Sequence, residues 1–218
     1  MLNSGKAKKY KLVILFIIVL IFMNGFLLFN HLHDYLCYKK RVDCNTLVIE
    51  GWLFDYMLDH AAREIKHNHY NRILILCLNE GMPVENFHKD FNETEAYRIS
   101  KRLTDQGIDP KLIRTISGRN LGSHHTFTRA LTLKKWIEVQ PMSIKAFNVY
   151  TGGPHARKTY TAFTRVFGYS YKIGVISSPI EHYNSRFWWS SLKGISVTLR
   201  FFIGYIYARF WNFEKLEK

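Results

Sequence analysis

The chain lacks the features that mark several large classes of protein. Its three cysteines, Cys37, Cys44 and Cys77, are too few for a disulfide scaffold, and no spacing resembles a zinc site. There is no Gly-x-Gly-x-x-Gly fingerprint, Walker A sequence, Gly-x-Ser-x-Gly elbow or His-Glu-x-x-His motif. We therefore expect no metal site, and the sequence names no cofactor. Cys37 and Cys44 either pair in an oxidising compartment or remain two thiols.

Acidic residues are also scarce. The 218 residues include 31 Lys and Arg against 17 Asp and Glu, which gives a net charge of +14. Between Lys111 and Lys172 there are eleven cations, and Glu138 is the single acid. Such a balance indicates either an anionic partner or substrate, or a solvated basic surface. The hydrophobic fraction of 47% is ample for a core, and no internal repeat is present.

The N-terminal region predicts a membrane anchor. Leu12 to Phe29 is a run of 18 residues without a charge, preceded by a basic flank over 1–11. As a helix it would span roughly 27 Å, close to the ~30 Å hydrocarbon core of a bilayer. A cleaved signal peptide is the alternative, but no small-x-small cleavage site follows. We expect an uncleaved single-pass anchor over 12–29 and a linker over 30–45.

The lysines beside this run favour an orientation. Lys6, Lys8, Lys9 and Lys11 lie before it, whereas the next cations, from Lys39 onward, lie further from its other end. The positive-inside rule therefore predicts a cytoplasmic N-terminus and an extracytoplasmic domain at the bacterial inner membrane.

The rest of the chain alternates between strand and helix patterns. Apolar strands are expected at 46–50, 72–78, 112–117, 144–151 and 171–178, and helices at 53–69, 93–107, 123–139, 154–168 and roughly 185–213. Strands that alternate with helices predict a parallel sheet. We therefore predict an α/β, Rossmann-like three-layer sandwich with a mostly parallel five-stranded sheet over 46–213, and a tail over 214–218. The last helix would cover the sheet or lie on the membrane.

Ligands of such folds bind outside the carboxyl ends of the strands. Glu50 and Gly51 directly follow the first strand, and Arg119 follows the third between two glycines. Glu95 opens the second helix of the domain, where it is either a site residue or an ordinary helix-dipole acid.

The fourth strand ends in the most informative stretch, "TGGPHARKTY". Gly152 and Gly153 permit close backbone approach, and His155, Arg157 and Lys158 then enter the first helical turn. Cations there oppose the helix dipole unless an anion offsets them. We therefore predict that this turn holds an anionic group and that His155 transfers protons. The alternative is that the two cations point into water.

These segments resemble the YdcF-like (SanA/ElyC-like) family of bacterial proteins over about 46–210. The similarity rests on "VIEGWL", "TEAYRISKRLTDQGI", "SHHTFTRAL", "YTGGPHARKTYTAF" and "SSPIEHYNSRFWWSSLKGI". It implies a Rossmann-like fold, a role in the cell envelope and a polar pocket of Glu50, Glu95, Thr126 and His155, with Arg157 or Lys158 as its cation. Glu50-Gly51 stands where the family often has paired glycines, and Arg129 where it usually has asparagine.

Three hypotheses on function follow. The first is an enzyme, a hydrolase or transferase, in which Glu50 and His155 act as acid and base on an anionic or lipid-linked envelope precursor. The second is a non-catalytic ligand-binding or scaffold protein that uses the same pocket. The third, suggested by fold class alone, is a nucleotide or S-adenosylmethionine binder. Because of the anchor, no nucleic acid is expected as a partner.

Overall fold

The protein is described by a computed structural model over residues 4–79, 95–119, 124–140 and 144–213; the predicted tail lies outside these ranges. Five strands form one parallel sheet in the order β3-β2-β1-β4-β5. They are β1 (Thr46–Glu50), β2 (Arg72–Asn79), β3 (Ile113–Arg119), β4 (Ala146–Gly152) and β5 (Lys172–Ser178). The predicted α/β fold is confirmed, and the strands pair in parallel throughout.

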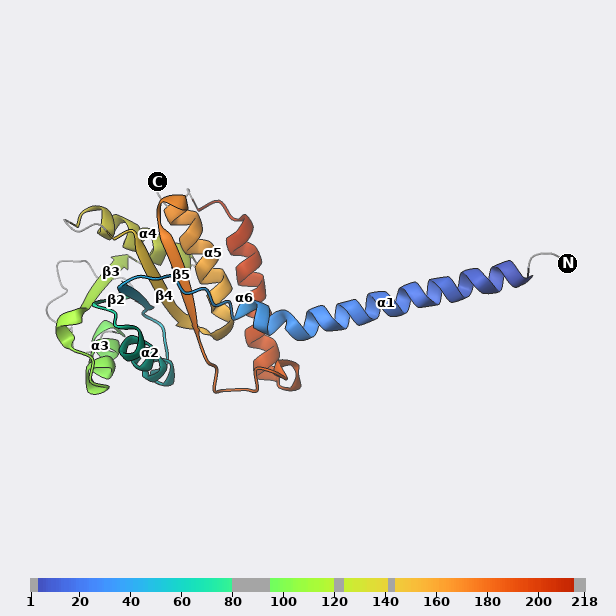
Figure 1. Cartoon of the computed structure of the whole chain (residues 1–218), viewed down its shortest axis with the longest axis horizontal. Helices are drawn as coiled ribbons and strands as arrows, with labels where there is room; N and C mark the ends of the chain where they lie inside the picture. Colours follow the sequence, from blue (N-terminus) through green and yellow to red (C-terminus); the bar gives the residue numbers. More distant parts are fainter. Residues whose placement is uncertain (1–3, 80–94, 120–123, 141–143, 214–218) are drawn as a thin grey trace.

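Helices cover both faces of the sheet (Figure 1). The helices are α1 (Ser4–Leu36), α2 (Asp55–Asn68), α3 (Glu95–Asp105), α4 (His125–Glu138), α5 (Ala156–Phe167) and α6 (Leu192–Phe210). The strands are apolar on both sides because each face is buried. One face packs with α2 and α3 around Ile49 and Ile75, and the other with α4 and α5 around Val48 and Phe147.

The strand order places β1 beside β4, although the two strands are far apart in the sequence. From β1 the chain moves outward through β2 to β3, and then crosses back to place β4 on the other side of β1. Ile49 is in register with Tyr150, so the carboxyl ends of β1 and β4 lie together. This reversal of strand order is where doubly wound folds hold their ligands.

The segment after β4 starts with a tighter turn than predicted. A 3-10 turn over Gly153–His155 precedes α5, so the regular helix begins at Ala156. Gly153 has φ of 41°, which side chains rarely adopt, and the turn can therefore bend sharply at the strand end.

The terminal helical region is split and does not cover the sheet. A 3-10 turn (Trp188–Ser190) precedes α6, whose first turn is capped by the Ser191 hydroxyl accepting from the Gly194 amide. α6 packs against α5, outside the layer that contacts the sheet. The expectation that it covers the sheet is thus corrected, because α4 and α5 already fill that face.

α1 is longer than the predicted anchor. It is one continuous helix through Leu36, and the part that begins at Lys9 is long and apolar enough to cross a membrane. Figure 1 shows it extending away from the α/β domain. Residues 30–36 had been expected to form a linker, but they are helical, and His33 and Leu36 are buried at 2% and 0% exposure. The end of α1 is therefore part of the domain's packing.

The chain between α1 and β1 is fixed along the edge of the sheet. Lys40 exchanges two backbone hydrogen bonds with Val175 of the edge strand β5, at 2.9 and 2.8 Å. The Asn148 side chain bonds both the amide and the carbonyl of Val42, each at 2.9 Å. These contacts attach α1 to the sheet through residues 37–45, which we call the strap. This segment had been expected to be a linker.

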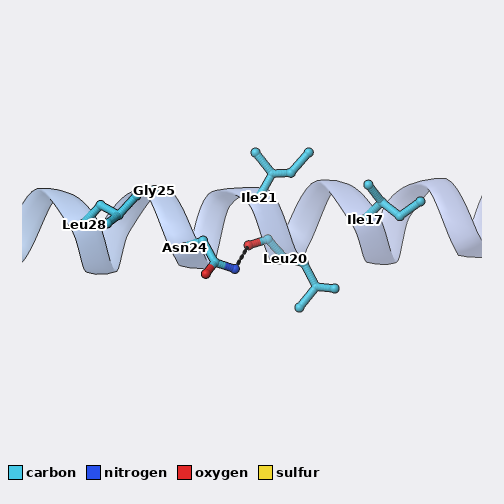
Figure 2. A pocket seen from close by; sticks show the side chains of 6 residues that line it. All are labelled: Ile17, Leu20, Ile21, Asn24, Gly25 and Leu28. Carbon is cyan, nitrogen blue, oxygen red and sulfur yellow. Dashed lines mark hydrogen bonds between the residues drawn. The ribbon is translucent and has the colours of Figure 1, made fainter.

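A shallow hollow lies on the uncharged stretch of α1 (Figure 2). Its lining comes from this one helix: Ile17, Leu20, Ile21, Asn24, Gly25 and Leu28. The Asn24 side-chain amide donates to the Leu20 carbonyl at 2.8 Å, which satisfies it within its own helix. The hollow is remote from the strand ends, and we assign it no role in ligand chemistry.

Gly174 provides a test of the strap. A Cβ at this position would overlap Asn148 Oδ1, which holds the strap, and would lie 2.6 Å from the Lys40 carbonyl oxygen and 2.9 Å from the Val42 amide nitrogen. Gly174→Ala should therefore force the strap off β5 and lower the free energy of unfolding by about 1–3 kcal/mol. Thermal unfolding of the full chain in detergent measures this. Gly25→Ala, whose Cβ meets nothing within 4 Å, is the control and should not lower the transition, because Ala is the better helix former.

Candidate functional site

Glu50 lies fully buried at the carboxyl end of β1. Its Oε2 accepts hydrogen bonds from the hydroxyls of Thr151, at the end of β4, and Thr159, on α5; the second bond is 3.0 Å. Two hydroxyl donors on one oxygen favour the ionised form of the carboxyl group. Burial therefore does not force Glu50 to become neutral.

His155 is the second buried member of the site, with 6% exposure. Its Nδ1 lies 2.8 Å from the Thr159 hydroxyl, 3.2 Å from that of Thr151 and 3.3 Å from Glu50 Oε2. Each hydroxyl has one hydrogen, and both hydrogens are directed at Glu50. The hydroxyl oxygens must then accept from the imidazole, so we assign the proton of neutral His155 to Nδ1.

This assignment leaves His155 Nε2 unprotonated and therefore basic. Nε2 lies 3.5 Å from the hydroxyl of Thr126, in the first turn of α4. The imidazole is flanked by the rings of Trp52 and Phe201, with centroids 5.0 and 5.1 Å away and edge-on geometry. Trp52 follows β1 and Phe201 belongs to α6, so the base faces a partly apolar surrounding built from four segments of the chain.

Two cations accompany this pair. Arg129 lies on α4, one turn after Thr126, and is 8% exposed. Lys158 lies on the first turn of α5, and its aliphatic chain passes Gly204 of α6. Burial lowers the pKa of Lys158, as does the charge of Arg129, whereas Glu50 acts in the opposite direction.

The pKa values of Glu50 and His155 are both lowered. For Glu50, burial favours the neutral acid, but the charges of His155 and Arg129 and its hydrogen bonds outweigh burial and hold the pKa at about 2. For His155, burial lowers the pKa, Glu50 opposes this, and Lys158 contributes to the lowering. At neutral pH the pair is therefore a carboxylate beside a neutral imidazole.

Several buried polar atoms of the site have no partner among the described residues. They are Glu50 Oε1, Trp52 Nε1 and Arg129 Nε, one acceptor and two donors. A buried polar group without a hydrogen bond is costly, and native proteins usually satisfy it with water or a ligand. Within the described ranges, His, Cys, Asp and Glu side chains form no group of three or more that could hold a metal ion.

The predicted site residues divide into two sets. Glu50, Thr126, His155 and Lys158 come together at the ends of β1 and β4. The glycines are fixed by packing: a Cβ on Gly51 would lie 2.7 Å from Cys77 Sγ, and one on Gly152 would lie 2.8 Å from the Trp52 ring. Gly153 likewise has no room for a Cβ beside Ile180.

Arg157 is directed away from the buried pair. Its guanidinium stacks on Tyr35 and Tyr38 at 3.8 and 4.0 Å from the ring centroids, and its Nε donates to the Tyr35 carbonyl at 2.6 Å. It therefore fastens α1 to α5. Lys158, not Arg157, accompanies Glu50 and His155.

The other two predicted residues are outside the cluster. Arg119 ends β3, two strands from β1, and Glu95 is exposed at the start of α3, where its charge acts on Cys77. Neither has a described contact with Glu50 or His155.

Sequence reasoning missed four residues that shape the site: Thr151, Thr159, Arg129 and Phe201. A signal did exist for Thr159, because it lies four positions after His155, and such spacing returns a side chain to the same face of a helix. Thr151 belongs to β4, so its contact with His155 depends on the turn that follows the strand. Arg129 had been noted only as a departure from a family pattern. Phe201 reaches His155 from α6, and nothing in its local sequence indicates that contact.

No protein-family model matches the chain, and no curated protein does either.

The site should make stability depend on pH. Below the ordinary histidine pKa of 6.5 the unfolded chain binds a proton that buried His155 resists, so acidification lowers the free energy of unfolding. Glu50 adds to this loss only between its ordinary value of 4.5 and about 2. Between pH 6.5 and pH 4.5, the free energy of unfolding of the wild type should fall by up to about 1.4 kcal/mol per pH unit more than that of His155→Asn.

Denaturant unfolding of the full chain in detergent over this pH range measures the difference. His69→Asn, at an exposed position after α2, is the control for loss of an imidazole and should keep the wild-type slope. Equal slopes for wild type and His155→Asn would contradict the assignment of a neutral buried imidazole.

Proposed function

We propose that this chain is a single-pass protein of the bacterial cytoplasmic membrane whose extracytoplasmic domain binds an anionic, phosphorylated envelope precursor and hydrolyses or transfers its phosphoryl group. The observation that carries the proposal is the buried Glu50–His155 pair, joined through two threonine hydroxyls and accompanied by two cations. Perturbed, coupled titratable groups at a topological switch point are typical of functional sites.

The balance of charge supports an anionic ligand. With Lys158 protonated, ionised Glu50 offsets one of the two cations, Arg129 and Lys158, and leaves one positive charge in excess. A phosphoryl group beside Lys158 would supply the missing negative charge. Trp52 Nε1 and Arg129 Nε are donors that phosphoryl oxygens could satisfy.

The geometry also supports acid–base chemistry. His155 Nε2 would accept a proton from a water molecule as the water oxygen bonds to phosphorus. The bond from phosphorus to the leaving oxygen then breaks, and the imidazolium returns its proton to that oxygen. Glu50 stabilises the imidazolium through Thr151 and Thr159, as a buried carboxylate does for a catalytic histidine. A hydroxyl in place of water would make the reaction a transfer.

The anchor and the resemblance to YdcF-like proteins support the envelope location. α1 is suited to cross one bilayer, and the lysines at its start favour the cytoplasmic side. A precursor carried on a lipid would then reach a domain that stands beside the same membrane.

Binding can be tested at two neighbouring residues. Isothermal titration of the full chain in detergent with polyprenyl phosphate or inorganic phosphate should give a Kd that Lys158→Met raises by about tenfold or more, since a charge-assisted bond contributes ~1.5–3 kcal/mol. Arg157→Met is the matched control: it removes an adjacent cation that contacts Tyr35, so it should leave the Kd unchanged. An effect of Arg157→Met equal to that of Lys158→Met would contradict the assigned site.

The same titration distinguishes the ligand classes. Tighter binding of nucleotides or S-adenosylmethionine than of every phosphorylated lipid would favour the hypothesis of a nucleotide or S-adenosylmethionine binder.

Turnover tests the catalytic roles. Release of inorganic phosphate from a bound phosphorylated ligand should fall by about 10²–10⁴-fold in His155→Asn, because the proton acceptor is lost. His182→Asn, which removes an imidazole packed edge-on against Phe54 and Tyr56, is the control and should retain activity. Tight binding without any turnover in wild type would favour the non-catalytic alternative.

A further inference from the structure

The outer face of α6 is an apolar stripe that no described residue covers. Its members recur three, four and seven positions apart, which places them on one side of the helix. They are Leu192, Leu199, Ile203, Ile206 and Phe210, with exposures of 88%, 41%, 67%, 41% and 78%. We call this set the α6 stripe. A contiguous exposed apolar face of this kind marks an interaction surface.

Cations border the stripe on both sides. Lys193 and Arg200 lie along one edge and Arg209 along the other, and all three are exposed. The helix contains no acidic residue. An apolar face with basic edges is the pattern of helices that lie in the plane of a membrane surface and meet anionic headgroups.

The contact between α1 and α6 indicates the level of the α6 stripe along α1. Tyr35 meets Tyr205 of α6, whose hydroxyl lies 2.9 Å away. Tyr205 is two positions from Ile203, about 200° around the helix, so α1 meets α6 on the side opposite the stripe. From Tyr35 back to Phe29 the six residues of α1 cover about 9 Å, close to the ~10–12 Å diameter of a helix. The stripe is therefore level with Phe29, where the uncharged run ends.

A second contact supports this level independently. The Phe29 ring packs on Trp188 and Trp189, at 4.6 and 6.1 Å between ring centroids, in the turn that directly precedes α6. Trp188 is fully buried, whereas Trp189 is partly exposed, and tryptophan is enriched at the interface between membrane and water. In Figure 1, α6 runs crosswise to α1 on the side of the domain from which α1 departs.

We propose that α6 lies on the surface of the bilayer that α1 spans, with its stripe in the acyl boundary and its edge cations among anionic headgroups. The opposite face of α6 presents Phe201 to His155. The site is then separated from the lipid by one helix, about 10–12 Å. This places the base within reach of a headgroup-sized ligand. The inference rests on the membrane anchor of the proposed function.

The test uses the full chain in vesicles that contain phosphatidylglycerol. A nitroxide on Ile203→Cys should collide more with oxygen, which concentrates in lipid, than with a water-soluble nickel chelate. A nitroxide on Val139→Cys, 76% exposed at the end of α4, should show the reverse. The unsubstituted chain, labelled in parallel, gives the background from Cys37, Cys44 and Cys77.

The outcomes separate the possible occupants of the stripe. Equal nickel access at positions 203 and 139 would overturn the proposal. Spin–spin broadening at 203 that disappears on dilution with unlabelled chain would also overturn it, because the stripe would then pair with a second copy. A nitroxide on Ile18→Cys tests the anchor separately: lipid contact at 18 without contact at 203 rejects only the surface helix, whereas contact at neither rejects the anchor.

The edge cations have their own test. The double variant Lys193→Glu, Arg209→Glu should lose lipid contact at position 203, because juxtamembrane cations are attracted to anionic lipid. Lys135→Glu, an exposed position on α4, is the matched control and should retain contact. Undiminished contact in the double variant would overturn the role of the headgroups.

Discussion

A buried carboxylate at the end of the first strand is the constraint on which the site depends. Ionised Glu50 needs donors, and the chain supplies them from β4 and α5, the elements that the crossover places beside β1. The hydroxyls that satisfy Glu50 are then committed as acceptors from His155, which fixes the imidazole's tautomer and leaves Nε2 basic. The charge of Glu50 thus determines the hydrogen bonds of two threonines and of His155, which lies in the turn after β4.

The junction between α1 and the α/β domain is the second organising feature of the structure. α1 does not end where its apolar run ends: its last turns bury His33 and Leu36, and Arg157 stacks on two tyrosines at and just beyond its end. The strap then pairs with β5 at Lys40. Because α5 carries both Arg157 and Lys158, a single helical turn connects α1 to the candidate site. The two cations looked equivalent in sequence, yet they serve these two different purposes.

Much of the fold was predictable, because it follows from local patterns. Strands with no polar alternation could only be buried on both faces, and their regular alternation with helices left a parallel sheet as the consistent arrangement. Glu50, Thr126, His155 and Lys158 were also within reach of sequence reasoning, since each lies at or near the end of a strand or the start of the following helix. Arg119 fits the same rule but ends β3, two strands from β1, because the rule does not say how far apart two strand ends lie.

The sequence by itself determined the apolar N-terminal helix, the α/β class and the end of the sheet at which polar groups gather, since these depend on composition and period along a continuous stretch. Only the tertiary structure decided which cation serves the site, that α6 packs on α5, and that Phe201 touches His155. Such contacts join residues far apart in the chain. They depend on strand order and helix packing, which no local pattern encodes.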